Sequence, residues 1–371
     1  MKITIVGGGI VGMTAAYLLS KEQDIQVTVI DREGAGQASA AASGIVCPWV
    51  SKRRNKTWYR LAVEGARFYR ELMPQLTAEA TVNPGYEQKG ALILRDSLAK
   101  INELAGIIEE RLVEAPEIGD LTVLSAAAIQ QQFPFIAEGL SGLHVSGGAR
   151  VDGSKLVAAL KEVAVHNGVD FITATARLAR KDNRLTVLVE GLEIAADKVL
   201  LATGAWLGEM FDEAVYCDIT TQKGQLLHLK TIQNSSDWPV IMPASAFSFV
   251  PFADHVVIGA SHEKNKGFNL APTIGELTAI ANESLRFAPG WETAEIIGVR
   301  TGTRAYTADY TPVLGQVPFA DNAYVANGLG ASGLTVGPYV GKVLVDLVLN
   351  RSVKIDLAQY PVERYLRLIH E

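Results

Sequence analysis

The first thirty residues alternate between apolar runs and short polar or glycine-rich breaks. Ile3, Ile5 and Val6 form an apolar run that is typical of a buried strand. Residues 11–21 follow with apolar positions at helical spacing, and residues 25–30 form a second apolar run. This order predicts a strand, a turn, a helix and a second strand, which is how a parallel α/β sheet begins.

The same periodicities divide the rest of the chain. Apolar residues three and four apart predict helices at 57–72, 97–113, 152–167 and 273–287, with Ser125 as the N-cap of a shorter helix. Apolar or alternating segments predict strands at 86–95, 169–176, 185–189, 198–202 and 323–326, and antiparallel strands within 222–259. A glycine-rich turn at 327–333 leads into a last helix that runs through Leu349.

These elements predict an α/β fold of composite α+β type. A Rossmann-like nucleotide-binding framework is interrupted by insertions that form a mainly antiparallel β-sheet. Both ends of the chain belong to the framework, so neither predicted domain is one continuous stretch. The nucleotide-binding domain is predicted at residues 1–84, 146–218 and 302–371, and the second domain at residues 85–145 and 219–301.

Composition and charge narrow the choice of partners. The net charge of −6 disfavours nucleic acid or an anionic membrane surface, and the basic run at 52–56 is interpreted as a solvated loop. Cys47 and Cys217 lie far apart, which is typical of a reducing compartment and predicts no metal site. A strand at residue 2 leaves no room for a signal peptide, and the apolar stretch 328–349 is interrupted by proline and charged residues. We therefore expect a soluble, cytoplasmic protein without a membrane span.

The turn after the first strand has the spacing of a dinucleotide-binding loop. Gly7, Gly9 and Gly12 match G-x-G-x-x-G between a strand and a helix, and Asp31 ends the second strand. Gly7 allows a tight turn, Gly9 allows a pyrophosphate to approach, and Gly12 allows the helix to pack closely on the strand. The helix N-terminus offers N–H groups to phosphates, and Asp31 can accept hydrogen bonds from a ribose. The unit predicts a bound dinucleotide, either NAD or FAD.

Seven segments, taken in order, favour FAD. They are residues 6–12, 150–156, 201–206, 223–225, 257–261, 304–315 and 328–338. Together they resemble the D-amino-acid oxidase-like superfamily of FAD enzymes, which includes glycine oxidase, sarcosine oxidase and D-amino-acid dehydrogenase. The resemblance runs almost from end to end, and it implies an FAD-binding framework with a substrate-binding domain. Because Tyr306 stands where covalent members carry a cysteine, it also implies that FAD is bound noncovalently.

The resemblance implies which residues surround the cofactor. Ser39 would contact the pyrophosphate, the Ala176 backbone would face the adenine, and residues 43–45 would line the isoalloxazine. The backbone N–H groups of residues 330–335 would face the flavin N1–C2=O edge, where a helix dipole stabilises negative charge. Trp206 is equally compatible with a core position. The predicted cofactor site is Gly7, Gly9, Ile10, Val11, Gly12, Asp31, Arg32, Ser39, Ser43, Gly44, Ile45, Ala176, Thr203, Gly204, Trp206, Gly330, Ala331, Ser332, Gly333, Leu334 and Thr335.

Arg304 is the candidate for binding a substrate carboxylate. It stands eight residues before Pro312 with Thr307 and Asp309 between them, as in the family pattern, whereas Arg300 lies four residues too early. A guanidinium pairs with a carboxylate through two parallel hydrogen bonds, which would orient the α-carbon of an amino acid. The alternative is that Arg304 forms a structural ion pair with Asp309.

Other expected substrate contacts depart from the family pattern. Ala331 stands where glycine oxidases have a second arginine, and a tyrosine expected near residues 248–249 is absent. His262 and Tyr306 stay as polar candidates for catalytic residues, although a lone histidine is equally compatible with a structural role.

The predicted function is FAD-dependent oxidation of a small amino acid: a D-amino acid, glycine or an N-alkyl glycine. The resemblance implies hydride transfer from the α-carbon to flavin N5, which yields an imino acid and then a 2-oxo acid. The apolar segment 247–252, with Ile45 and Leu334, is predicted to line the substrate cavity, so we expect small or apolar side chains and a preference for D over L. Two alternatives stay open: an amine oxidoreductase of the tRNA-modification type, which the charge disfavours, and a nucleotide-binding protein without amine chemistry. The electron acceptor could be oxygen, a quinone or another carrier.

Overall fold

The N-terminal unit lies at the centre of a six-stranded sheet in the computed structural model, which describes residues 1–51, 55–231 and 234–369. The strand order is β21-β22-β13-β1-β2-β9, and all neighbours are parallel except β21 and β22. Both faces of β1 are covered, so Ile3, Ile5 and Val6 are all buried. The strands are β1 (Lys2–Val6), β2 (Gln26–Asp31), β9 (Asp170–Thr173), β13 (Lys198–Leu201), β21 (Val313–Gln316) and β22 (Ala323–Asn327).

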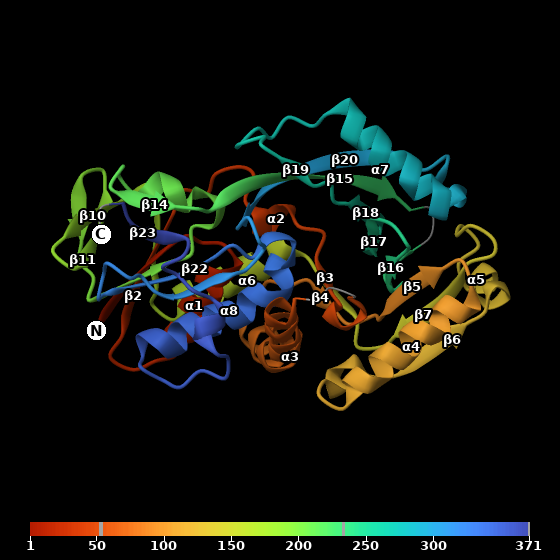
Figure 1. Ribbon diagram of the computed structural model, residues 1–371, viewed down its shortest axis with the longest axis horizontal. Helices are drawn as coiled ribbons and strands as arrows, with labels where there is room; N and C mark the ends of the chain where they lie inside the picture. The colour runs from red at the N-terminus through yellow and green to blue at the C-terminus, as the bar shows by residue number, and fades with distance from the viewer. Residues whose placement is uncertain (52–54, 232–233, 370–371) are drawn as a thin grey trace.

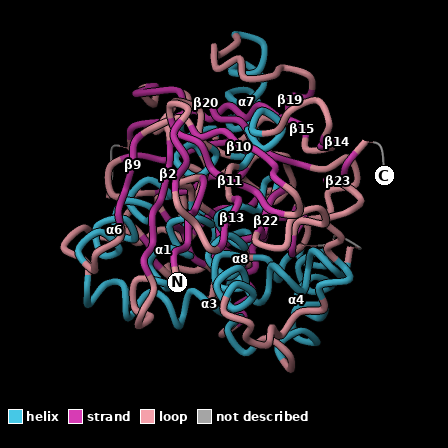
Figure 2. Tube along the Cα trace, turned by 90° about the vertical axis from the view of Figure 1, so that its left-hand side faces the viewer, coloured by secondary structure: helices cyan, strands magenta, loops and turns pink. Residues whose placement is uncertain are grey.

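Helices cover one face of this sheet and a small antiparallel sheet covers the other (Figures 1 and 2). On the helical face, α1 (Ile10–Leu19) packs between α6 (Gly153–His166) and α8 (Gly333–Val348), and α3 (Lys56–Glu79) packs against α8. On the other face lie β10 (Ala176–Lys181), β11 (Arg184–Val189) and β12 (Leu192–Ile194). A short pair, β14 (Val215–Cys217) and β23 (Leu366–Leu368), joins the C-terminal segment to this side. These layers are the predicted nucleotide-binding framework.

A second, nine-stranded sheet is mainly antiparallel, as predicted for the insertions. Its order is β19-β15-β18-β17-β16-β5-β7-β6, with β20 paired to β15. The strands are β5 (Ala91–Arg95), β6 (Leu121–Leu124), β7 (Ser141–Val145), β15 (Thr220–Lys230), β16 (Val240–Met242), β17 (Ser248–Pro251), β18 (His255–Gly259), β19 (Glu263–Lys264) and β20 (Ile296–Tyr306). Helices α5 (Ala126–Gln132) and α7 (Ile274–Phe287) pack on one face, and α4 (Leu98–Leu112) packs on the other.

Two predicted strands are each divided between sheets. The run 86–95 forms β4 (Tyr86–Glu87) and β5, because Gly90 between them takes φ +83° and breaks the extended backbone. β4 pairs with β8 (Ala149–Val151), which also pairs with β3 (Ile45–Val46), so this small sheet joins the two larger ones. The run 169–176 likewise ends as β9 in the six-stranded sheet and resumes as β10 in the three-stranded one.

The fold class predicted from the sequence is confirmed, with a parallel framework and a mainly antiparallel second sheet. The domain boundaries stay a prediction, and β20 runs across the expected boundary at residue 302. Of the basic run, residues 52–54 lie outside the described part of the chain, and α3 begins at Lys56. None of the helices that the structure describes combines the length and hydropathy needed to cross a bilayer.

Replacing Gly12 by alanine should destabilise the framework. A Cβ on Gly12 would lie 1.9 Å from the Gly7 carbonyl oxygen, so helix α1 would have to move off β1, at a cost of about 1–3 kcal/mol or more. The matched control is Gly106→Ala in α4, where a Cβ meets nothing within 4 Å and helix propensity favours alanine by about 0.5–1 kcal/mol. Urea unfolding should show a lower midpoint for Gly12→Ala only; equal midpoints for the two variants would contradict this account.

Candidate active site

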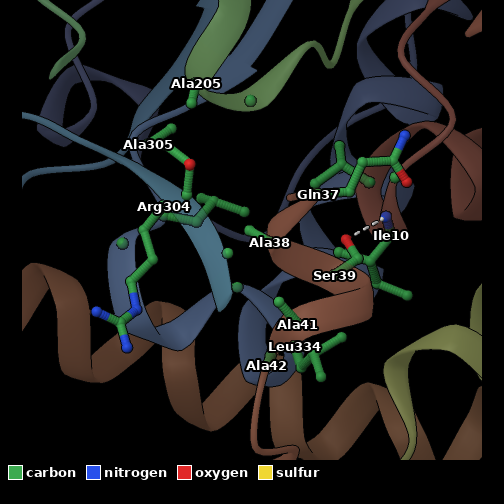
Figure 3. A pocket seen from close by; sticks show the side chains of 18 of the residues that line it. Ile10, Gln37, Ala38, Ser39, Ala41, Ala42, Ala205, Arg304, Ala305 and Leu334 are labelled. Carbon is green, nitrogen blue, oxygen red and sulfur yellow. Dashed lines mark hydrogen bonds between the residues drawn. The ribbon is translucent and has the colours of Figure 1, made fainter. Parts of the chain in front are cut away.

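A cavity of about 470 Å³ lies where the two large sheets meet. The carboxyl ends of β1, β2, β13 and β22 open into it, together with the first turns of α1 and α8. The short helix α2 (Ala38–Ala41) and strands β15 and β20 of the second sheet also line it, with α2 packed against β20 (Figure 3). Ligands of open α/β sheets bind at this carboxyl edge, so the cavity occupies the expected place.

The glycine turn places the N-terminus of α1 in the cavity wall. Gly7 has φ +107°, a left-handed conformation that other residues rarely adopt, and Gly9 is the N-cap of α1. Ser39 on α2 accepts a hydrogen bond from the Ile10 N–H at 3.0 Å (Figure 3), and a Cβ on Gly9 would lie 3.3 Å from the same hydroxyl. The first turn of α1 lines the cavity and carries no acidic side chain, so the positive end of the helix dipole is not neutralised there.

Asp31 lies at the end of β2 and holds three neighbouring groups together. Its Oδ2 accepts from the Gly8 N–H at 2.6 Å, and its Oδ1 accepts from the Glu33 N–H at 2.6 Å and from Gln37 Nε2 at 2.9 Å. Sequence reasoning anticipated a ribose contact but not this role. The carboxylate lines the cavity and, with about four lone-pair sites, keeps room for one more donor.

Thr203 and Trp206 follow β13 and form the floor of the same region. Thr203 Oγ1 is buried and has no hydrogen-bond partner among the described residues, although its residue lines the cavity. Trp206 also lines the cavity, and Arg32 lies over its ring at 4.4 Å from the centroid. Because Trp206 is half-buried and lines the cavity, the core interpretation of this residue is disfavoured.

Arg304 reaches into the cavity from β20. Its Nη1 donates to Gln222 Oε1 at 3.1 Å and to the Ser261 carbonyl at 2.8 Å, and it lies 3.5 Å from His262 Nδ1. A Cβ on Gly224 would lie 2.7 Å from Nη2, so the glycine leaves space for the guanidinium. Burial lowers the pKa of Arg304 to about 10, against the opposing charge of Glu263, so the group stays charged at neutral pH.

The ion pair considered for Arg304 is not formed. Asp309 instead pairs with Arg364 at 2.9 Å and accepts from the Tyr365 hydroxyl at 2.7 Å. Arg300 donates to the Ala40 carbonyl at 3.0 Å and does not line the cavity. Of the two arginines of β20, Arg304 therefore lines the cavity and Arg300 does not.

Nearly all predicted site residues come together around this cavity. Gly12 is an exception because it packs against the Gly7 carbonyl, and Tyr306 is another because it is buried and stacks on Tyr310 with 5.7 Å between ring centroids. The remaining predicted residues, which all line the cavity, are Gly7, Gly9, Ile10, Val11, Asp31, Arg32, Ser39, Ser43, Gly44, Ile45, Ala176, Thr203, Gly204, Trp206, His262, Arg304, Gly330, Ala331, Ser332, Gly333, Leu334 and Thr335.

The apolar wall differs from the one predicted. Within residues 247–252, Ser248 lines the cavity, while Phe249 packs in the core against Trp291 at 5.0 Å between centroids. Side chains alternate along β17, so the serine and not the phenylalanine faces the site. Sequence reasoning missed Met242 and Ala246, which line this wall and sit at or beyond the end of the short strand β16, where no periodicity marks them.

The sequence matches the model of the DAO family, described as FAD dependent oxidoreductase, over residues 2–347. The chain belongs to the DAO family. It is 39% identical to the uncharacterized oxidoreductase YurR of Bacillus subtilis over 96% of this chain and 97% of that protein. It is 25% identical to the glycine oxidase of Pseudomonas putida over 98% of each chain. The crystal structure of iminodiacetate oxidase from Chelativorans sp. BNC1 is similar with a TM-score of 0.92 and 34% identity, over 97% of this chain and 98% of that one.

This DAO-family chain is therefore an FAD-dependent oxidoreductase. The family match disfavours the alternative of a regulatory or NAD-dependent nucleotide-binding protein. The residues present fit the cofactor: the glycine turn leaves a cradle beside Ser39, where a Cβ on Gly9 would lie 3.3 Å from the hydroxyl. Among the residues described, no group of three or more His, Cys, Asp or Glu side chains is arranged to hold a metal ion.

FAD should be released intact when the enzyme is denatured. Neither cysteine lines the cavity, and burial raises the pKa of the Cys47 thiol to about 12, so it is a poor nucleophile at neutral pH. Acid or heat denaturation followed by filtration should move all of the yellow colour into the filtrate, as measured by absorbance. Colour that stays on the polypeptide would contradict noncovalent binding.

Proposed function

We propose that this DAO-family enzyme oxidises the carbon–nitrogen bond of a small amino acid: a D-amino acid, glycine or an N-alkyl glycine. The product is an imino acid, which water hydrolyses to a 2-oxo acid and ammonia or an amine. The observation that carries this proposal is Arg304, a charged guanidinium in the cavity wall whose Nη1 is held by the protein. A carboxylate is the substrate group that such a guanidinium binds best.

The cavity residues would hold FAD along its length. In this proposal the N-terminus of α1 and Ser39 bind the pyrophosphate, Asp31 binds a ribose, and residues 330–335 face the flavin ring. These residues would thereby place FAD to supply the hydride acceptor for the substrate carbon. The framework would then be the FAD-binding domain and the nine-stranded sheet the substrate-binding domain, with boundaries near those predicted.

Two features of the chain would favour the reaction. Arg304 orients the substrate by its carboxylate, and its own position is set by Gln222 and the Ser261 carbonyl, so little freedom is lost on binding. The N-terminus of α8, whose N-cap Ser332 makes no side-chain cap, directs its positive end at the cavity. That end would stabilise negative charge developing there.

His262 is the second polar candidate for contacting substrate. It lines the cavity and its Nδ1 lies 3.0 Å from Gln222 Oε1, next to Arg304. Tyr306, by contrast, is proposed to act only through packing, because it lies outside the cavity wall.

A substrate with two carboxylates is a second candidate. The protein with 34% identity is named iminodiacetate oxidase, and iminodiacetate is itself an N-substituted glycine. In this chain His262 lines the cavity beside Arg304, and its imidazole can donate a hydrogen bond to a second carboxylate, which favours the same class of substrate. The amine oxidoreductase acting on tRNA is disfavoured by the net charge of −6. We place the enzyme in the cytoplasm, with oxygen, a quinone or another carrier as acceptor.

A substrate panel tests the proposed function. Anaerobic bleaching of the flavin spectrum should occur with D-alanine, D-proline, glycine, sarcosine or iminodiacetate, and more slowly with D-glutamate, because Ala331 offers no second arginine for a charged side chain. Oxygen uptake with the best substrate then separates oxidase from dehydrogenase. Best turnover of an L-amino acid, or no bleaching by any carboxylate-bearing amine, would reject the proposal.

Removing the Arg304 guanidinium should abolish substrate binding but not cofactor binding. Loss of one partner of a buried charge pair costs about 3–5 kcal/mol, so Arg304→Leu should lower kcat/KM by at least about 100-fold. Arg304→Lys should recover only part of this, because an ammonium lacks the two-pronged geometry.

Arg300→Leu is the matched control on the same strand and should stay close to wild type in kcat/KM. All three variants should keep a full flavin spectrum. Normal turnover by Arg304→Leu, or loss of FAD from it, would show that Arg304 has another role.

A further inference from the structure

A stack of three side chains joins the two sheets beside the cavity. Phe268, in loop 265–272 after β19, stacks on Trp206 with 5.2 Å between ring centroids and 13° between planes. Arg32 lies over the Trp206 ring, with its guanidinium carbon 4.4 Å from the centroid. Arg32 and Trp206 line the cavity, whereas Phe268 does not, so the phenylalanine supports that wall from outside.

Loop 265–272 is held at its far end by the second sheet. Lys223 on β15 is 1% exposed, and its Nζ donates to the Ala271 carbonyl. The completely buried Gln225 accepts from the Thr273 N–H at 2.9 Å through its Oε1, and the Asn269 side chain accepts from the Ala271 N–H at 2.9 Å. Burying a lysine is costly unless its hydrogen bonds are made, so these residues indicate that the loop has a defined position.

A second contact closes the loop onto the framework. Leu270 packs directly on Gly36, where a Cβ would lie 2.5 Å from Leu270 Cδ2. Gly36 itself accepts from the Thr303 N–H of β20 at 2.9 Å through its carbonyl. Phe268 and Leu270 therefore press on two segments, 32–36 and 204–206, that belong to the framework and flank the end of β2.

The end of β2 is where a dinucleotide fold holds the adenosine half of its ligand. The wall there is built from residues of the framework, but it is covered by a loop that belongs to the second sheet (Figure 1). Phe268 is 38% exposed, so its ring is not needed to fill a core. The role of the exposed Phe268 ring is therefore its contact with Trp206.

We propose that loop 265–272 is a clasp that retains FAD, with Phe268 fixing Trp206 and Arg32 against the adenosine end of the cofactor. The proposal goes beyond the amine chemistry and does not depend on Arg304. It accounts for the burial of Lys223 and Gln225 on β15, which hold the loop in place. Opening of this clasp would set the rate at which FAD leaves.

The test measures FAD release and uses no substrate. After rapid dilution of the holoenzyme, recovery of free-flavin fluorescence gives the dissociation rate. Phe268→Ala should release FAD roughly threefold to tenfold faster, the range expected for losing one aromatic pair. Phe268→Tyr keeps the ring and should stay within about twofold of wild type. Phe268→Ala should lower the thermal midpoint of the apoprotein only slightly, since it removes a single aromatic pair, and Phe268→Tyr should leave the midpoint unchanged.

Tyr216→Ala is the matched control. Tyr216 is 37% exposed, and the guanidinium carbon of Arg367 lies 4.1 Å from its ring centroid, so it also makes one exposed ring contact. It lies on β14 and does not line the cavity. It should not change the release rate. Should Phe268→Ala fail to fold, Leu270→Ala takes its place with the same expectation. Unchanged release in the loop variants, equal acceleration by Tyr216→Ala, or acceleration by Phe268→Tyr would each overturn the proposal.

Discussion

The Asp31 carboxylate is the interaction on which the cavity depends. It joins the glycine turn, the end of β2 and the residue that leads into α2 by three short hydrogen bonds. Since α2 carries Ser39, and Ser39 in turn bonds the first turn of α1, the Asp31 carboxylate helps to set the spacing of this wall of the cavity. Hydrogen bonds to a charged acceptor are about twice as strong as neutral ones, which suits a turn that must stay open for a ligand.

The second sheet lines the same cavity through the alternation of side chains along two of its strands. Two strands, β15 and β20, run side by side, and one face of the pair carries Arg304 and Gly224 toward the cavity, with Gln222 bonded to Arg304. The opposite face carries Lys223 and Gln225, which hold loop 265–272. Because strand side chains alternate, one pair of strands supports both the proposed substrate contact and the proposed clasp on the cofactor.

Much of the framework could be predicted because its signals are local. The G-x-G-x-x-G turn, the helix at 152–167 and the apolar run of β1 each depend on residues a few positions apart. The division of the run 86–95 between two sheets depended on distant partners, because β4 pairs with β8 whereas β5 pairs with β7 and β16. The inward turn of Ser248 in place of Phe249 likewise depended on the register of β17 with its neighbours.

The sequence by itself determined that the chain binds a dinucleotide and that Arg304, not Arg300, matches the position of a carboxylate-binding residue. Only the tertiary structure decided what Asp31 bonds, that Asp309 pairs with Arg364, and that Trp206 lies between Arg32 and Phe268. The physical reason is distance along the chain. Turn and helix signals are written within a few residues, whereas a side chain's partner is chosen by which strands and loops the completed fold brings together.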